Sequence, residues 1–355
     1  MFPSNIKTKL IILILLFLII FSCFSLTSGP IKISVLEIFN ILSHKFGFLS
    51  EVDEHSFNNI QESVLLNIRL PRIILAVLVG GGLGTAGAIL QGLFRNPLVD
   101  PGFIGVSSGA AVGAIISIMF GNIIGQYVSI DFEQFLLPCL AIIGSFLTIL
   151  LVYRMSRVNG KTNIMAMLLS GIAVNAFSGA IIGFFISISN DVQLRSFTFW
   201  TLGGLDSADW FVVSLASLFT IIPFLYIYNL KQELDIFMLG DGDAANLGVN
   251  IEYLKKKIIL ISSVMVGVSV AFCGMIGFVG LVTPHLIRLF IAPNHRYLIP
   301  GSCLLGALIL VVADFISKTI ISPAQLPIGV VTSAIGAPFF IWLIVNQKRR
   351  FSYSE

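Results

Sequence analysis

Long apolar runs alternate with short polar segments along almost the whole chain. A membrane-spanning helix needs about 20 consecutive apolar residues. By that measure the pattern predicts ten spans, of which the seventh and eighth are joined by a very short link, Gly274–Gly277. The ten predicted spans are residues 10–28, 70–93, 100–120, 134–153, 162–188, 210–229, 257–275, 278–291, 298–317 and 327–346. The pattern therefore predicts an all-α polytopic membrane protein with about ten transmembrane helices.

The first apolar run, Leu10–Leu26, follows Lys7 and Lys9 and has two interpretations. A cleaved signal peptide also begins with basic residues followed by an apolar stretch. This run is long for such a stretch, however, and no small-residue cleavage motif follows it. We therefore expect an uncleaved first membrane helix.

The composition agrees with a membrane protein. Hydrophobic residues make up 56% of the chain and charged residues 11%, whereas soluble domains carry about 25% charged residues. With both termini placed in the cytoplasm, 15 of the 21 Lys and Arg residues fall in inside segments, which is the bias that cytoplasmic loops show. The net charge of +3 is too small to indicate a nucleic-acid partner. We therefore expect both termini to be cytoplasmic.

The second predicted span is rich in glycine and is followed by two proline breaks. Five glycines lie within the eight positions Gly80–Gly87, and small residues let membrane helices pack closely. A broken element at membrane depth is tolerated only inside protein or beside a water-filled cavity. The candidates for lining or gating a pathway across the bilayer are therefore Asn96, Pro97, Asp100, Pro101 and Gly102.

A further proline lies in the eighth predicted span, and we add Pro284 and His285 to the pathway candidates. A lone histidine invites a metal or haem interpretation, but beside a proline at a helix end it is more often a structural residue. The sequence shows no metal-ligand spacing, no nucleophile–base arrangement and no P-loop motif GxxxxGK(S/T). We therefore expect no metal site and no catalytic residue in this chain.

Four charged residues stand at predicted span ends on the expected outer side. Arg69 and Arg72 are three residues apart and share a helix face; they either extend to lipid headgroups or form a docking surface for an acidic partner. Asp314 and Lys318 are four residues apart and can pair along the helix. Alternatively, Asp314 is the coupling acid of an ion-driven secondary transporter, because acids within spans are often functional. Spacing alone does not decide between these alternatives.

The polar segment 230–256 is the longest one expected on the inner side. Within it, residues 239–248 predict a short helix with acids at its start and a glycine at its end. Such a helix is either a connector or the contact for a cytoplasmic motor subunit. The residues concerned are Asp241, Gly242, Asp243, Ala244, Ala245, Asn246, Leu247 and Gly248.

Several motifs in one register resemble a known family. They are RLPR at 69–72, QGLFRNPL at 91–98 followed by DPG at 100–102, GVSSGA at 105–110, GFVGLVTPHLIRL at 277–289, HRYLIPG at 295–301 and LPIGVVTSAIGAPFFIWL at 326–343. With these motifs the chain resembles the FecCD/BtuC-like permeases of ABC importers for iron–siderophore, haem and cobalamin. The resemblance extends from about residue 65 to the end of the sequence, and the first 60 residues carry no motif of this family.

The resemblance implies a single transmembrane permease domain, residues 1–355, with the fold of type II ABC importers. It also implies a homodimer in the lipid of a bacterial cytoplasmic (inner) membrane, with the pathway between the subunits. Two cytoplasmic ATPase subunits would hydrolyse ATP, and an extracytoplasmic binding protein would deliver the substrate. No covalently bound cofactor is implied.

The resemblance also assigns roles to the charged residues. Basic residues at the positions of Arg69, Arg72 and Lys318 face carboxylates of the binding protein in this family. Some members have arginine where this chain has Lys318, so the contact there is expected to be monodentate and weaker. The resemblance places coupling to the ATPase at residues 241–248, within the coupling loop 230–256.

The motifs also favour one cargo over others. Residues 188–200 and 92–111 look most like the corresponding segments of haem permeases. A ferric siderophore is the next alternative, and cobalamin is the third. Outside this family, an ion-coupled transporter that uses Asp314 and a channel or membrane scaffold remain as alternative classes.

Overall fold

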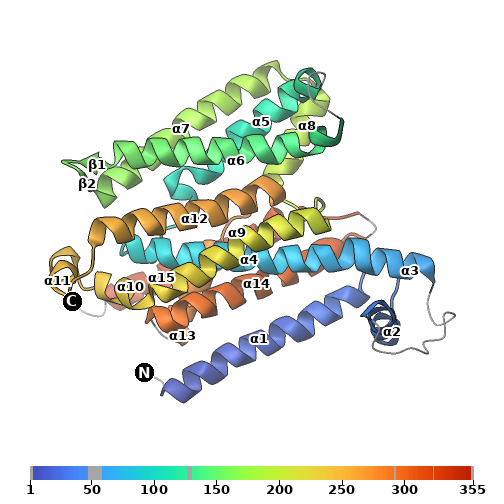
Figure 1. Ribbon diagram of the computed structural model, residues 1–355, viewed down its shortest axis with the longest axis horizontal. Helices are drawn as coiled ribbons and strands as arrows, with labels where there is room; N and C mark the ends of the chain where they lie inside the picture. The colour runs from blue at the N-terminus through green and yellow to red at the C-terminus, as the bar shows by residue number, and fades with distance from the viewer. Residues whose placement is uncertain (1–2, 47–57, 126–129, 292, 323, 353–355) are drawn as a thin grey trace.

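The computed structural model describes residues 3–46, 58–125, 130–291, 293–322 and 324–352 and is almost entirely helical (Figure 1). Its elements are α1 (Ser4–Thr27), α2 (Val35–Phe46), α3 (Asn59–Val64), the π-helical turn η2 (Leu65–Arg69), α4 (Leu70–Leu93), the 3-10 turn η3 (Pro101–Ile104), α5 (Val106–Gly125), α6 (Ile130–Met155), β1 (Arg157–Val158), β2 (Lys161–Thr162), α7 (Ile164–Ile188), α8 (Asp191–Leu202), α9 (Trp210–Asn229), α10 (Lys231–Phe237), α11 (Asp241–Asn246), α12 (Ile251–Cys273), α13 (Val279–Phe290), α14 (His295–Thr319) and α15 (Ile328–Ser352). Strands β1 and β2 form a small antiparallel hairpin.

Each of the ten predicted spans overlaps a long helix, but the span predicted at 100–120 begins with the turn η3 and becomes α5 only at Val106. Among the described residues, seven helices are long and apolar enough to cross a membrane, and three shorter apolar helices lie in α5, α13 and α15. The close pair of spans, seven and eight, is separated as predicted: α12 ends before Gly274, which has φ +68°, and α13 begins at Val279. The all-α polytopic prediction is confirmed.

The long helices form a bundle whose two ends carry different short elements (Figure 1). One end carries α2 and α3, and we name it the α2 end. The other carries α10, α11 and the β1–β2 hairpin, and we name it the α11 end. Helix α1 begins and α15 finishes at the α11 end, as an even number of spans requires.

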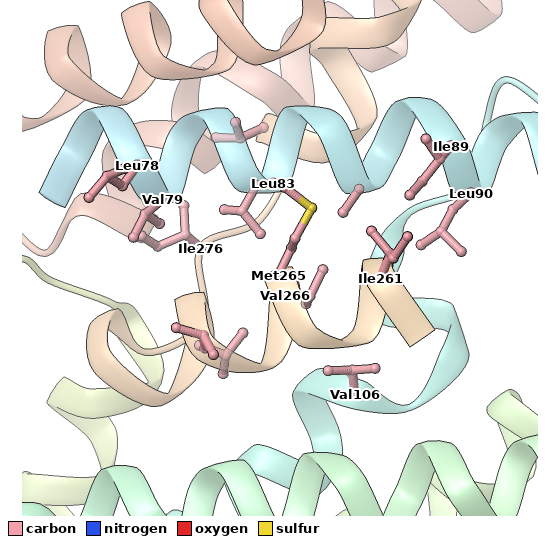
Figure 2. Packing of buried hydrophobic residues seen from close by; sticks show 14 of the residues in the cluster. Leu78, Val79, Leu83, Ile89, Leu90, Val106, Ile261, Met265, Val266 and Ile276 are labelled. Carbon is pink, nitrogen blue, oxygen red and sulfur yellow. The ribbon is translucent and has the colours of Figure 1, made fainter. Parts of the chain in front are cut away.

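Helix α4 lies at the centre of the bundle and packs against α14, α12, α13, α9 and α1. It is apolar on all sides, which is typical of a helix surrounded by others. Figure 2 shows one of these interfaces, where Leu83 of α4 meets Met265 of α12. Leu83 is 4% exposed and Met265 is 0% exposed. Among the candidate membrane spans of the described residues, the one that contains α4 is the most buried, in agreement with close packing.

Several helices lie in segments that the apolar pattern left as connections, among them α2 and α8. Helix α8 begins with a capping box. The Asn190 side chain accepts from the Gln193 backbone amide, and the Gln193 side chain accepts from the Asn190 backbone amide. Before α2, Ser34 and Glu37 make the same reciprocal pair of bonds. Within the described residues each of α2 and α8 has 12 residues, which is too short to span a bilayer, so a search for long apolar runs does not find them.

Candidate functional site

An ion-pair network lies at the α2 end, where the sequence placed its docking residues. Arg72, near the start of α4, donates from Nε to Asp314 of α14 at 2.7 Å. Its Nη1 atom donates to Asp206, in the loop between α8 and α9, at 2.9 Å. Asp314 also pairs with Lys318 at 3.1 Å, one turn further along α14. The predicted pair along α14 is therefore present, as one part of a larger network.

The predicted docking residues are more buried than their position at a span end suggested. Arg69 is 6% exposed and Arg72 is 9% exposed. Arg69 donates to the backbone carbonyl of Leu26, in the last turn of α1, and to that of Ile31, in the segment that follows this helix. The alternative in which both arginines extend to lipid headgroups is therefore wrong, because each guanidinium has protein partners.

Lys318 connects α1 to the network that already joins α4 and α14. Its ammonium donates to the side-chain oxygen of Ser25 at 3.0 Å, near the end of α1. Asp314, which lies between Lys318 and Arg72, is 0% exposed. Asp314 therefore pairs with Lys318 as helical spacing predicts, and its buried carboxylate is shared with a second cation, Arg72.

Asp206 is the member of this network that the sequence did not indicate. Its side chain is 75% exposed, and 134 residues separate it from Arg72. No spacing rule relates residues so far apart. The loop that carries it is anchored to the end of α12, because the Gly204 amide donates to the Cys273 carbonyl at 2.9 Å and the Ser207 hydroxyl to the Phe272 carbonyl at 2.6 Å.

At the α11 end, the predicted short helix is present as α11, Asp241–Asn246. Ala244 is its buried residue, and Gly248 follows it with φ +85°. The other predicted coupling residues are at least partly exposed: Asp241, Gly242, Asp243, Ala245, Asn246, Leu247 and Gly248. A polar, exposed helix of one to two turns suits contact with a further subunit better than burial in the bundle.

Asp241 fastens this helix to two long helices. Its Oδ1 accepts from Arg95, directly after α4, and its Oδ2 accepts from Lys255 of α12 at 2.8 Å. Arg95 also donates to the Phe237 carbonyl at 2.8 Å, and its guanidinium lies 4.4 Å from the centre of the Phe237 ring. Arg95 adopts φ +49°, an uncommon conformation for a residue other than glycine.

The charge state of Asp241 follows from these contacts. Burial raises the pKa of the carboxyl, but the hydrogen bonds from Lys255 and Arg95 outweigh it and hold the pKa below its ordinary value. The contribution of Asp241 to stability is therefore complete above the pKa of the unfolded chain, about 3.9. It is lost only as the pH falls through the lower pKa of the folded state.

A second contact joins the α10–α11 segment to the bundle. Asp235 of α10 accepts from His295, at the start of α14, both from the backbone nitrogen at 2.9 Å and from the ring Nδ1 at 2.6 Å. His295 is 2% exposed. Together with Asp241, this contact links the segment to α4, α12 and α14.

The pathway candidates come together from two distant parts of the sequence. Pro97 and His285 line one small recess, and His285 packs edge-on against Phe339 of α15. Pro101 and Pro284 are buried, whereas Asn96 and Pro97 are exposed. Asp100 accepts from the amide of Gly102 at 2.7 Å and so caps the turn η3.

Gln91 joins these two segments and was part of a motif without an assigned role. Its amide nitrogen donates to the carbonyls of Val99 and Leu281, at 3.3 and 3.2 Å. Its amide oxygen accepts from Arg288 of α13. One buried side chain therefore connects α4, the segment after it and α13. Within the described residues, no group of three or more His, Cys, Asp or Glu could hold a metal ion.

Comparison with known proteins gives one consistent result. Residues 15–346 match the FecCD transport family. The hemin transport system permease protein HmuU of Yersinia pestis is 39% identical over 350 residues, which cover 96% of each chain. The vitamin B12 import system permease protein BtuC of Citrobacter koseri is 38% identical over 289 residues, which cover 81% of this chain and 84% of the relative.

A solved structure agrees with these relatives. It is an ABC transporter assigned to the metal-chelate type, in an inward-facing conformation. It superposes with a TM-score of 0.81 at 30% sequence identity and covers 96% of this chain and 99% of its own.

Proposed function

The chain belongs to the FecCD transport family, as a multi-pass permease subunit of an ABC importer, and we propose that its cargo is haem. The observation that carries this proposal is the similarity to a hemin permease along 96% of both chains. The B12 permease matches over a smaller share, 81% of this chain. An ion-coupled transporter that uses Asp314 is no longer a candidate, because ABC importers use ATP.

The two ends of the bundle would serve different partners. Family membership implies a separate ATPase, a substrate-binding protein and dimerisation. In this proposal the α2 end is extracytoplasmic and receives the haem-loaded binding protein at Arg69, Arg72 and Lys318. The α11 end is cytoplasmic, together with both termini in the bacterial inner membrane, and residues 241–248 contact the ATPase.

The pathway would open by movement of whole helices. ATP binding and hydrolysis in the partner subunits would displace α11, and the contacts of Asp241 and Asp235 would carry that displacement to α4, α12 and α14. Such a rigid-body change alternates access to the pathway. The two proline-containing segments would adjust, because Pro97 follows the end of α4 and Pro284 cannot donate a backbone hydrogen bond within α13.

Uptake into proteoliposomes tests the cargo. The vesicles hold this chain with its ATPase, and the matching binding protein is added with haem, a ferric siderophore or cobalamin. ATP-dependent accumulation of haem alone is the expected result. Accumulation of one of the other two cargoes instead would keep the importer and discard haem.

A conservative variant at the α2 end tests docking. Charge reversal at Arg72 is a poor choice, because it would place a second carboxylate beside buried Asp314. We expect Arg69→Gln to weaken binding of the binding protein about two- to fivefold, the range that the loss of one ion pair of up to about 1 kcal/mol supplies, and to leave assembly with the ATPase unchanged. Surface plasmon resonance on the permease–ATPase complex in nanodiscs measures this affinity.

The matched control for Arg69→Gln is Lys45→Gln, which removes one exposed positive charge from α2 at the same end of the bundle. If the two variants weaken binding equally, the lower affinity results from the reduced positive charge of the α2 end and not from a specific contact of Arg69. An unchanged affinity in Arg69→Gln would remove Arg69 from the docking surface.

Transport per ATP hydrolysed tests the coupling role of Asp241. Asp241→Asn removes the charge that holds Arg95 and Lys255, so we expect this ratio to fall about two- to fivefold, as expected for partly exposed ion pairs. In the wild type the ratio should not change between pH 6 and 8 on account of Asp241, because the pKa of this carboxyl lies below its ordinary value.

Asp243→Asn is the control for Asp241→Asn, since it removes the same charge from an exposed position of α11. If both variants lower the ratio equally, the ion pairs of Asp241 do not transmit the motion.

A further inference from the structure

The two acids at the α2 end differ in how easily each can leave its partner. We name Arg69, Arg72, Lys318, Asp206 and Asp314 the α2-end charge cluster. Asp314 is fully buried between two cations, whereas the side chain of Asp206 is 75% exposed. If a buried carboxylate moves away from its cations, the charged groups are left unpaired in a poorly solvated environment, which is energetically costly. An exposed carboxylate moves into water at small cost.

Arg72 contacts the buried and the exposed acid through different nitrogen atoms. Its Nε faces Asp314 at 2.7 Å, within the bundle, and its Nη1 faces Asp206 at 2.9 Å, on the exposed side. The backbone of the Asp206 loop is anchored to Phe272 and Cys273. The side chain of Asp206 can therefore turn away from Arg72 while the loop stays in place.

The cluster also carries more positive than negative charge. It contains three cations and two acids, and the guanidinium of Arg69 is bonded to the carbonyls of Leu26 and Ile31, which carry no formal charge. A site with one excess positive charge and an arginine that already holds a carboxylate favours a further carboxylate. The partner it suits is an acidic protein surface.

We propose that Asp206 is an exchangeable internal partner of Arg72: it holds the guanidinium while no binding protein is docked, and a carboxylate of the binding protein takes its place on docking. This inference rests on the proposed docking role of the α2 end. Exchange of one carboxylate for another keeps Arg72 paired throughout, and Asp314 keeps the guanidinium oriented. Asp206 thus weakens docking, because the incoming acid must displace it.

Removing the charge of Asp206 tests the exchange. The permease–ATPase complex in nanodiscs is titrated with the binding protein of the same importer, and Asp206→Asn is compared with Asp209→Asn. Asp209 is exposed, lies three residues away and caps α9, and asparagine is an equally good cap. Both variants remove one negative charge from the same surface, so the difference between them isolates the contact with Arg72.

We expect Asp206→Asn to bind the binding protein about threefold more tightly than Asp209→Asn, within the range of an exposed ion pair. Asp206→Ala should give the same increase, with melting temperatures of all variants close to the wild type. Equal affinities of Asp206→Asn and Asp209→Asn, or weaker binding by Asp206→Asn, would overturn the exchange.

The Arg69→Gln variant separates this failure from a failure of docking. If Arg69→Gln weakens binding while Asp206→Asn and Asp209→Asn have the same affinity for the binding protein, docking at the α2 end stands and only the exchange is wrong. If neither variant changes the affinity relative to its control, the docking role itself is wrong.

Discussion

Replacing Asp314 with alanine is expected to lower the free energy of unfolding by about 3–5 kcal/mol, the usual result of removing one partner from a buried ion pair. Asp314 is 0% exposed, and the side chains of Arg72 and Lys318 are 11% and 10% exposed. Without the carboxylate, both cations lose their shared partner. Asp206 still reaches Arg72, whereas Lys318 loses its carboxylate and, among the described residues, keeps its bonds to Ser25.

Equilibrium unfolding of the purified chain in mixed detergent micelles measures this loss. Asp314→Asn keeps nearly the same volume and should reproduce most of the effect, because the charge is what the cations lose. Asp206→Asn is the control, since it breaks an exposed pair worth only about 0.2–1 kcal/mol. A loss in Asp314→Ala no larger than in this control would contradict a structural role for the buried carboxylate.

Gly80→Ala is expected to destabilise the protein by about 1–3 kcal/mol, the typical result of overpacking. Helices α4 and α14 approach so closely that a Cβ atom on Gly80 would overlap the backbone carbonyl of Gly306, and one on Gly306 would overlap that of Gly80. A backbone carbonyl cannot rotate away as a side chain can, so α14 must move outward from the central helix. The melting temperature and the yield of monodisperse protein in detergent measure the effect.

Gly82→Ala is the matched control, two residues further along the same helix. The nearest atom to its added Cβ is the Thr220 Cγ2, at 3.5 Å, which is an ordinary contact. Since alanine favours a helix by up to about 1 kcal/mol over glycine, this variant should be neutral or slightly stabilised. If both variants lose stability equally, glycine at position 80 is not required by the contact with α14.

The order and type of the long helices could be predicted from the sequence because the bilayer imposes a length. Every predicted span, from residues 10–28 to 327–346, overlaps a helix, although α5 begins six residues into the span predicted at 100–120. The short helix at Asp241–Asn246 was also predicted, since its acids and the following glycine are local signals. The pair of Asp314 and Lys318 follows from helical spacing alone. These features depend on residues that are close together in the chain.

The partners of Arg72, and the burial of Arg69 and Arg72, were decided only by the tertiary structure. Asp206 and Asp314 lie 134 and 242 residues from Arg72, and which acid meets this arginine depends on how α4, α14 and the loop before α9 assemble. The same holds for Asp241, which joins Arg95 across 146 residues. Hydrophobic length and helical period determine where helices form, whereas charges far apart in sequence become partners only where packing brings helix ends together.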